Sequence, residues 1–179
     1  SFLERHNLVE AYDAWIKSKP ILNFTGYAYE LMKYVPITED NEWHPKAVMP
    51  KKEYIINTFN KQFNQIVTTA KNGMNTDSSF ICAIDVSLSM TSKAKGINLS
   101  AYQVALSMAL YFSELLTGQF HNQFIQFSTK AKLSSFKGET PIEKLTNFTP
   151  DDMGSTNFLA VAKIFANLKK IGIDEDLLP

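Results

Sequence analysis

Residues 81–90, ICAIDVSLSM, decide the fold class and raise the first functional question. An apolar run ends at Asp85, and Ser87 and Ser89 follow at every second position. A short, continuous apolar run is typical of a strand that is buried on both faces of a parallel sheet. A loop that leaves such a strand can direct alternate side chains toward one point. We therefore expect a strand over residues 79–85 with three side-chain oxygens at its carboxyl end.

The segments after this strand alternate between strand and helix patterns. Strands alternating with helices predict an α/β domain with a doubly wound, Rossmann-like sheet. In such sheets ligands bind at the carboxyl ends of the strands, where Asp85 lies. Helices are expected over residues 100–118, 141–148 and 154–172, and strands over residues 121–128 and 131–138.

Residues 1–75 are predicted to form a helical N-terminal segment, followed by the α/β unit over residues 76–179. Apolar residues recur at helical spacing in this first segment, which is typical of amphipathic helices. Its three prolines make residues 36–50 an expected loop. The helices of the segment are expected over residues 4–18, 24–35 and 51–73.

The overall composition argues against several classes of protein. With 45% hydrophobic and 20% charged residues, the 179-residue chain has the composition of a globular protein. Lysine and arginine total 18, as do aspartate and glutamate, so no broad electrostatic footprint for nucleic acid is expected. The single cysteine, Cys82, excludes an intramolecular disulfide and favours a cytoplasmic, intracellular setting. No apolar run is long enough to span a membrane, so no membrane partner is expected.

The oxygens after the strand suit a metal ion. A carboxylate and two hydroxyls are hard ligands, which fit Mg²⁺, and also Mn²⁺ or Ca²⁺, better than zinc or copper. Further ligands must come from water and a distant loop, where Thr156 is the candidate and Ser155 the competing choice. Two alternatives stay open. Asp85 would cap backbone N–H groups in a turn, or Thr156 would cap the helix that starts at Asn157.

The motif DVSLSM at residues 85–90, followed by an apolar helix, a strand and MGSTNF at residues 153–158, resembles the von Willebrand factor A (vWA) domain. With AYDAWIKSKPILNFTGYAYELMKYV at residues 11–35 and FIQFST at residues 124–129, the chain more closely resembles the family DUF2828. More distantly it is similar to the TROVE-type Ro RNA-binding proteins. This resemblance implies a vWA sheet preceded by helices, with a metal-ion-dependent adhesion site held by Asp85, Ser87, Ser89 and Thr156.

The same resemblance implies that the sheet is incomplete. The vWA strand order is 3-2-1-4-5-6, and this chain supplies only the first three strands. A third metal-site aspartate is not carried onto Asp174 or Asp176, which lie in a polar connection. We therefore expect residues 76–179 to be the N-terminal half of the domain. The strand over residues 79–85 then has an open edge, to be completed by the missing C-terminal half or by another subunit.

The expected function is a non-enzymatic protein-interaction module. The metal would bind the exposed carboxylate of a protein partner, with Leu88 and Ser155 as partner contacts; Leu88 as a simple loop anchor is the alternative. No nucleophile–base pair or phosphate-cradling glycine loop suggests an enzyme. The rival hypotheses are an RNA-binding, Ro-like protein and a structural subunit of a larger assembly such as a virus particle. For that last hypothesis, the expected location is the virion instead of the cytoplasm.

Overall fold

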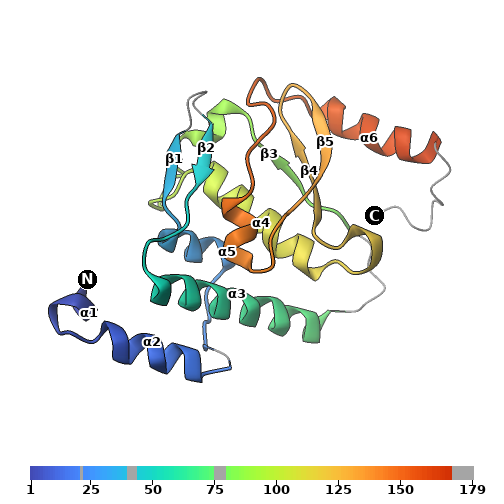
Figure 1. The fold of residues 1–179 in the computed structure, drawn as a ribbon. Coiled ribbons are helices and arrows are strands. Elements are labelled where there is room, and N and C mark those ends of the chain that lie inside the picture. Colours follow the sequence, from blue (N-terminus) through green and yellow to red (C-terminus); the bar gives the residue numbers. More distant parts are fainter. Residues whose placement is uncertain (21, 40–43, 75–79, 171–179) are drawn as a thin grey trace.

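The computed structural model of the protein describes residues 1–20, 22–39, 44–74 and 80–170 (Figure 1). These residues form a mixed α/β arrangement with two small sheets, one of which contains a parallel strand pair. The first elements are α1 (Phe2–Arg5), α2 (Val9–Ser18), the 3₁₀ helix η1 (Ala28–Tyr34), β1 (Ile37–Glu39), β2 (Pro45–Ala47) and α3 (Glu53–Gly73). The later elements are β3 (Ala83–Asp85), η2 (Leu88–Thr91), α4 (Ala101–Leu115), η3 (Gly118–Phe120), β4 (Gln123–Phe127), β5 (Ala131–Ser135), α5 (Pro141–Thr146) and α6 (Phe158–Lys170).

The N-terminal helix expected over residues 4–18 is interrupted. Asn7 has a positive φ of 52°, a left-handed conformation that an asparagine tolerates and a continuous helix does not. It separates the short α1 from α2. The second expected helix is also different, because η1 is a 3₁₀ helix and not an α-helix.

The predicted loop over residues 36–50 was wrong in part, because it contains β1 and β2. These strands pair antiparallel, with Ile37 opposite Ala47 and Glu39 opposite Pro45. Pro45 is tolerated because a proline at the first position of an edge strand need not donate a ladder hydrogen bond. Strands of three residues are too short for an alternating pattern to reveal them.

The long helix α3 confirms the prediction for residues 51–73. Its apolar face is buried, and Phe59 and Phe63 on this face stack with ring centroids 5.9 Å apart. Figure 1 shows α3 lying beneath α4 and α5, with α2 alongside it. The backbone N–H of Ile142 in α5 donates to the Asn60 side chain of α3 at 3.0 Å, which ties the helical segment to the α/β part.

The larger sheet has the order β3-β4-β5. β3 pairs parallel to β4, with Asp85 opposite Phe127, and β4 pairs antiparallel to β5. Since side chains alternate along a strand, Ile84 and Phe124 face one side of the sheet, while Asp85 and Phe127 face the other. Ile84 and Phe124 join the core cluster that includes α4. Phe127 instead contacts Phe158 of α6, so helices lie on both faces of the sheet.

The expectation that residues 79–85 form a strand buried on both faces was wrong in two respects. The strand covers only Ala83–Asp85 of the described residues, and Ala83 is exposed. Ile84 faces α4 and is 4% exposed, whereas Ala83 faces the side on which α6 packs mainly over β4 and β5. That face of β3 is therefore open at Ala83, and no strand of the described residues pairs with the edge of β3 away from β4.

One hydrophobic core draws on both predicted units. It joins Leu31, Phe59 and Phe63 of the helical segment to Leu106 of α4 and Phe124 of β4. A second, smaller cluster around Ile16 holds α2 against α3. Among the described residues, the helices are too short or too polar to cross a membrane. The predicted helix end at Gly172, and Asp174 and Asp176, lie outside the described residues.

Candidate cation site

The end of β3 is held in place by backbone hydrogen bonds. The Val86 N–H donates to the Phe127 carbonyl oxygen at 2.9 Å, which extends the pairing with β4 by one residue. The Ser87 N–H then donates to Asp85 Oδ1 at 2.8 Å. One carboxylate oxygen of Asp85 thus caps a backbone N–H in the turn after β3, as expected if Asp85 caps this turn. The other carboxylate oxygen is left to interact elsewhere.

That second oxygen meets the distant loop. Thr156 Oγ1 donates to Asp85 Oδ2 at 3.1 Å, although the two residues are 71 positions apart. Ser87 Oγ lies 3.1 Å from Thr156 Oγ1 and 3.1 Å from Ser89 Oγ. The four predicted ligand residues therefore converge in one cluster, which we call the four-oxygen site: Asp85, Ser87, Ser89 and Thr156.

Thr156 is not the residue that caps α6. The helix begins at Phe158, and the Ala160 N–H donates to Asn157 Oδ1 at 3.3 Å. Asn157 thus occupies the capping role, and the Thr156 hydroxyl is directed to the site. Ser155, the competing candidate, is exposed and lies beside the cluster without a side-chain bond to its members among the described contacts.

The spacing of these oxygens fits a small divalent cation. Ligands about 2.1 Å from Mg²⁺ on adjacent octahedral vertices lie about 3.0 Å apart, whereas the longer bonds of Ca²⁺ place them about 3.3–3.7 Å apart. The 3.1 Å separations around Ser87 Oγ are hydrogen-bond distances, and they bring these oxygens close enough to contact one cation. Mg²⁺ also retains waters readily, so an incomplete set of protein ligands suits it. The residues present therefore fit a Mg²⁺-sized ion.

The four-oxygen site lies at the protein surface, and its innermost residue, Ser87, is buried. Ser87 is 2% exposed, Asp85 is half-buried, and Ser89 and Thr156 are exposed. A cation held by these oxygens would keep one side open to water or to a ligand. Within the described stretches, no group of three or more His, Cys, Asp or Glu side chains is placed to hold a metal. The four-oxygen site is of another kind, because three of its four side chains are hydroxyls.

Thr129, which the sequence analysis missed, supports the loop that carries Thr156. Its Oγ1 accepts the Ser155 N–H at 3.2 Å, and its carbonyl oxygen accepts the Asn157 side chain at 3.1 Å. Gly154 passes so close that an added Cβ would stand 1.9 Å from Thr129 Oγ1. No local pattern marks Thr129, because its role depends on a segment 26 residues away.

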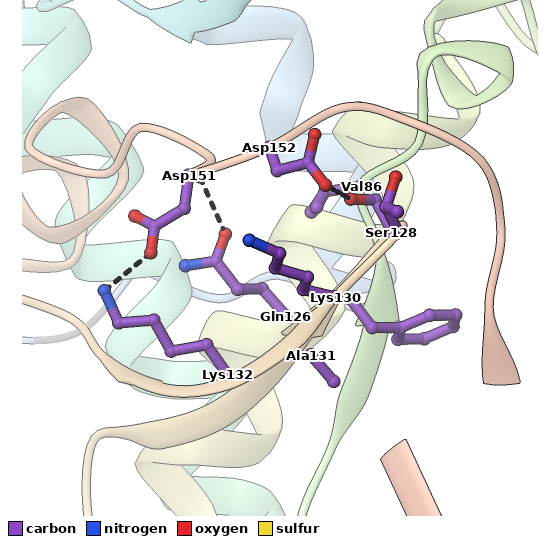
Figure 2. A pocket seen from close by; sticks show the side chains of 10 residues that line it. Val86, Gln126, Ser128, Lys130, Ala131, Lys132, Asp151 and Asp152 are labelled. Carbon is purple, nitrogen blue, oxygen red and sulfur yellow. Dashed lines mark hydrogen bonds and ion pairs between the residues drawn. The ribbon is translucent and has the colours of Figure 1, made fainter. Parts of the chain in front are cut away.

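A pocket of about 720 Å³ with a mixed polar and apolar lining lies next to Thr129 (Figure 2). Figure 2 shows both acidic side chains of the lining with a partner. Lys132 pairs with Asp151 at 2.6 Å, and Ser128 donates to Asp152 at 2.8 Å. The Ser128 hydrogen bond, with the Gly154 N–H, holds the pKa of the Asp152 carboxyl below its usual value. The pocket lining comprises Val86, Gln126, Phe127, Ser128, Thr129, Lys130, Ala131, Lys132, Asp151 and Asp152. The polar members of this lining hold Asp151 and Asp152 of the 149–157 loop through hydrogen bonds and an ion pair.

Cys82, the residue directly before β3, shows no sign of nucleophilic activation. It is partly buried against the core cluster, and burial raises the pKa of its thiol to about 11. A neutral thiol is a poor nucleophile and a poor metal ligand. Cys82 therefore contributes packing against the core cluster.

Comparison with known proteins gives one match. The sequence profile of the family described as "Domain of unknown function (DUF7788)" matches residues 77–176, which is more than half of the chain. This region includes all four members of the four-oxygen site. No curated protein and no solved structure matches the chain significantly.

The match corrects the family assignment made from sequence. The resemblance to DUF2828, to vWA domains and to TROVE-type Ro proteins is wrong, because the profile that matches is that of DUF7788 and none of those three families is found. The short D-x-S-x-S motif carried most of that resemblance. Such a motif describes a local arrangement of oxygens, which unrelated folds can also contain.

Proposed function

The chain belongs to the DUF7788 family, a domain of unknown function, and we propose that it is a non-enzymatic interaction module that binds an acidic group of a protein partner through Mg²⁺. The observation that carries the proposal is the convergence of Thr156 with Asp85, Ser87 and Ser89 across about 70 residues. Hydroxyl and carboxylate oxygens at these separations suit a hard cation. Mn²⁺ and Ca²⁺ are the alternatives for the same ligands.

The exposed side of the site explains why a partner carboxylate is the expected ligand. Four protein oxygens leave an octahedral cation with open positions that water fills. A carboxylate brings the negative charge that three hydroxyls lack, so it displaces water favourably. In this proposal Ser155, exposed beside Thr156, and Leu88, exposed between two ligand serines, contact the partner.

The open edge of β3 supports a protein partner as well. Cys82 accepts from Ile125, and Val86 donates to Phe127, so these residues direct backbone groups toward β4. In a parallel pair the intervening Ala83 and Asp85 direct theirs to the opposite side. No strand of the described residues pairs there. We propose that another subunit, or a further part of a longer chain, completes the sheet at this edge.

RNA binding has no comparable support. The charges balance at 18 and 18, and the aromatic side chains of α3 pack in the core. A role as a structural subunit of an assembly would use the β3 edge and does not conflict with the cation site.

Direct titration with Mn²⁺, followed by water-proton relaxation, tests the proposal. The wild type should bind one Mn²⁺ that Mg²⁺ displaces, and an aspartate-containing peptide should lower the relaxation by replacing bound water. Asp85→Ala should abolish binding, and Thr156→Ala should weaken it at least about tenfold. Ser92→Ala, which removes an exposed hydroxyl just beyond η2, is the matched control and should bind as the wild type does.

Circular dichroism of each variant separates loss of the site from loss of the fold. If folded Asp85→Ala bound Mn²⁺ like the wild type, the four oxygens would be only a hydrogen-bonded loop closure. The proposed function would then be abandoned.

A further inference from the structure

Three large apolar side chains next to the four-oxygen residues in the sequence are exposed. Leu88 is 57% exposed, Phe158 is 71% exposed and Leu159 is 64% exposed. These are three of the five most exposed large apolar side chains of the described residues; the other two, Phe2 and Tyr27, belong to the N-terminal segment. Single exposed apolar residues are ordinary, but a cluster of them marks an interaction surface.

The backbone places these side chains on the two segments that supply the oxygens. Leu88 lies between Ser87 and Ser89, and its N–H donates to the Met153 carbonyl oxygen at 3.0 Å, which joins the first loop to the second. Phe158 follows Thr156 by two residues. Its ring lies 5.1 Å from that of Phe127, the residue opposite Asp85 in the β3–β4 pairing. We call Leu88, Phe158 and Leu159 the apolar rim.

We propose that the apolar rim selects partner segments in which an acidic side chain has bulky apolar neighbours. This inference rests on the proposed function and names the partner class that fits the same site. The cation requires an anionic group but does not distinguish one exposed carboxylate from another. The rim adds the distinction, because a residue beside the bound carboxylate would bury apolar surface against Leu88, Phe158 or Leu159. A nucleic acid offers anionic groups without apolar neighbours, so it fits this surface less well.

Two short blocked peptides test the proposal at saturating Mg²⁺. One has the sequence Gly-Leu-Asp-Phe-Gly and the other Gly-Ser-Asp-Ser-Gly, and a Gly-Leu-Asn-Phe-Gly peptide reports binding without the carboxylate. The wild type should bind the apolar-flanked aspartate peptide about tenfold more tightly than the serine-flanked one, the expected effect of burying about one apolar side chain. The asparagine peptide should bind more weakly than its aspartate counterpart.

Phe158→Ser and Leu88→Ser remove rim contacts without touching a proposed ligand side chain. In both variants the ratio between the two aspartate peptides should fall toward one, while Mn²⁺ affinity stays at the wild-type value. Phe2→Ser is the matched control, since Phe2 is 60% exposed and lies in α1. It should keep the tenfold ratio.

The outcomes separate the two proposals. A wild-type ratio near one, or a tenfold ratio that persists in both rim variants, overturns the rim while leaving the cation site intact. Failure of both aspartate peptides to bind the Mg²⁺-loaded protein overturns the partner class. Failure of the wild type to bind Mn²⁺ overturns the proposed function itself, and the rim inference with it.

Discussion

Thr129 shows how one side chain can set the position of a distant site. It stands just beyond β4, in the turn to β5, and it bonds both neighbours of Thr156. The near contact with Gly154 leaves no room for any other residue at that position without displacing the Thr129 hydroxyl. The location of the Thr156 oxygen therefore depends on the Thr129 hydroxyl as well as on its own loop.

Replacing Thr129 by valine, which has a similar shape but no hydroxyl, should weaken Mn²⁺ binding about fivefold. The change leaves the Ser155 N–H without its acceptor, and a lost hydrogen bond costs about 1 kcal/mol. Hydrogen exchange of the Ser155 amide should speed up in the same variant, which gives a readout independent of the metal. Thr129→Ser keeps the hydroxyl and should behave as the wild type. Equal weakening in the serine and valine variants would show that the methyl group, and not the hydrogen bond, is responsible.

Cys82 gives a second prediction at the scale of the residue. Because burial raises the pKa of its thiol from 9.0 to about 11, the thiolate fraction at pH 8 should fall about 100-fold below that of an unperturbed thiol. Reaction with a chromogenic disulfide should therefore be at least about 100-fold slower in the native protein than in urea. The reaction should accelerate as the pH rises toward 11, since the thiolate then forms. Similar rates in buffer and urea at pH 8 would show that Cys82 is freely accessible.

At the scale of the element, the start of α4 is set by two capping residues, Ser100 and Gln103. Ser100 Oγ accepts the Gln103 N–H at 3.1 Å, and the Gln103 side chain accepts the Ser100 N–H at 2.9 Å. This reciprocal capping satisfies two backbone donors that a helix start leaves unpaired. The apolar helix that follows packs on β3 and β4. The cap therefore also sets the point at which the helix begins to cover the sheet.

Ser100→Ala should lower the free energy of unfolding by about 1 kcal/mol, the usual cost of losing such a cap. Urea denaturation followed by circular dichroism measures the change. Ser92→Ala, a nearby exposed serine, should change stability by less than about 0.5 kcal/mol. Equal effects of the two substitutions would mean that the capping geometry does not contribute to stability.

The elements also show which features a sequence can predict. The helices α3 and α4 were predicted well. A long amphipathic pattern in α3, and a strongly apolar one in α4, persists over many turns. β1 and β2 were missed, since three-residue strands depend on a partner strand and not on a local pattern. The break at Asn7 depends on one residue with a positive φ, which a periodic apolar pattern hides.

The residues of the candidate site also fall into those that the sequence predicted and those that it did not. Asp85, Ser87 and Ser89 were expected together because they follow one strand at its carboxyl end. Thr156 was one of two candidates for the distant ligand, and the vWA resemblance, since corrected, was what implied the full set of four. Thr129 was not predicted, since its bonds are tertiary. The exposure of Phe158 and Leu159 was also missed, because an apolar helix start is ordinarily read as a buried face.

At the scale of the whole molecule, the helical segment and the α/β part share one core. Phe59 of α3 is 1% exposed and belongs to the same cluster as Leu106 and Phe124, and the Asn60–Ile142 hydrogen bond adds a polar link between the two parts. A domain with one continuous core unfolds as a cooperative unit. We therefore expect a destabilising substitution in α3 to lower the stability of the sheet that positions the four-oxygen site.

Phe59→Ala should lower the free energy of unfolding by about 3–5 kcal/mol, because it removes a buried aromatic ring and leaves a cavity. Native-state hydrogen exchange can then compare the amides of α3 with that of Ile125 in β4, and both should lose protection by the same amount. Phe2→Ala, which removes an exposed ring from α1, is the control and should leave both sets unchanged. If the Ile125 amide kept its wild-type protection in Phe59→Ala, the sheet would be stable without the helical segment. The residues 1–75 would then act as a separate unit, and the cation site would depend on the α/β part alone.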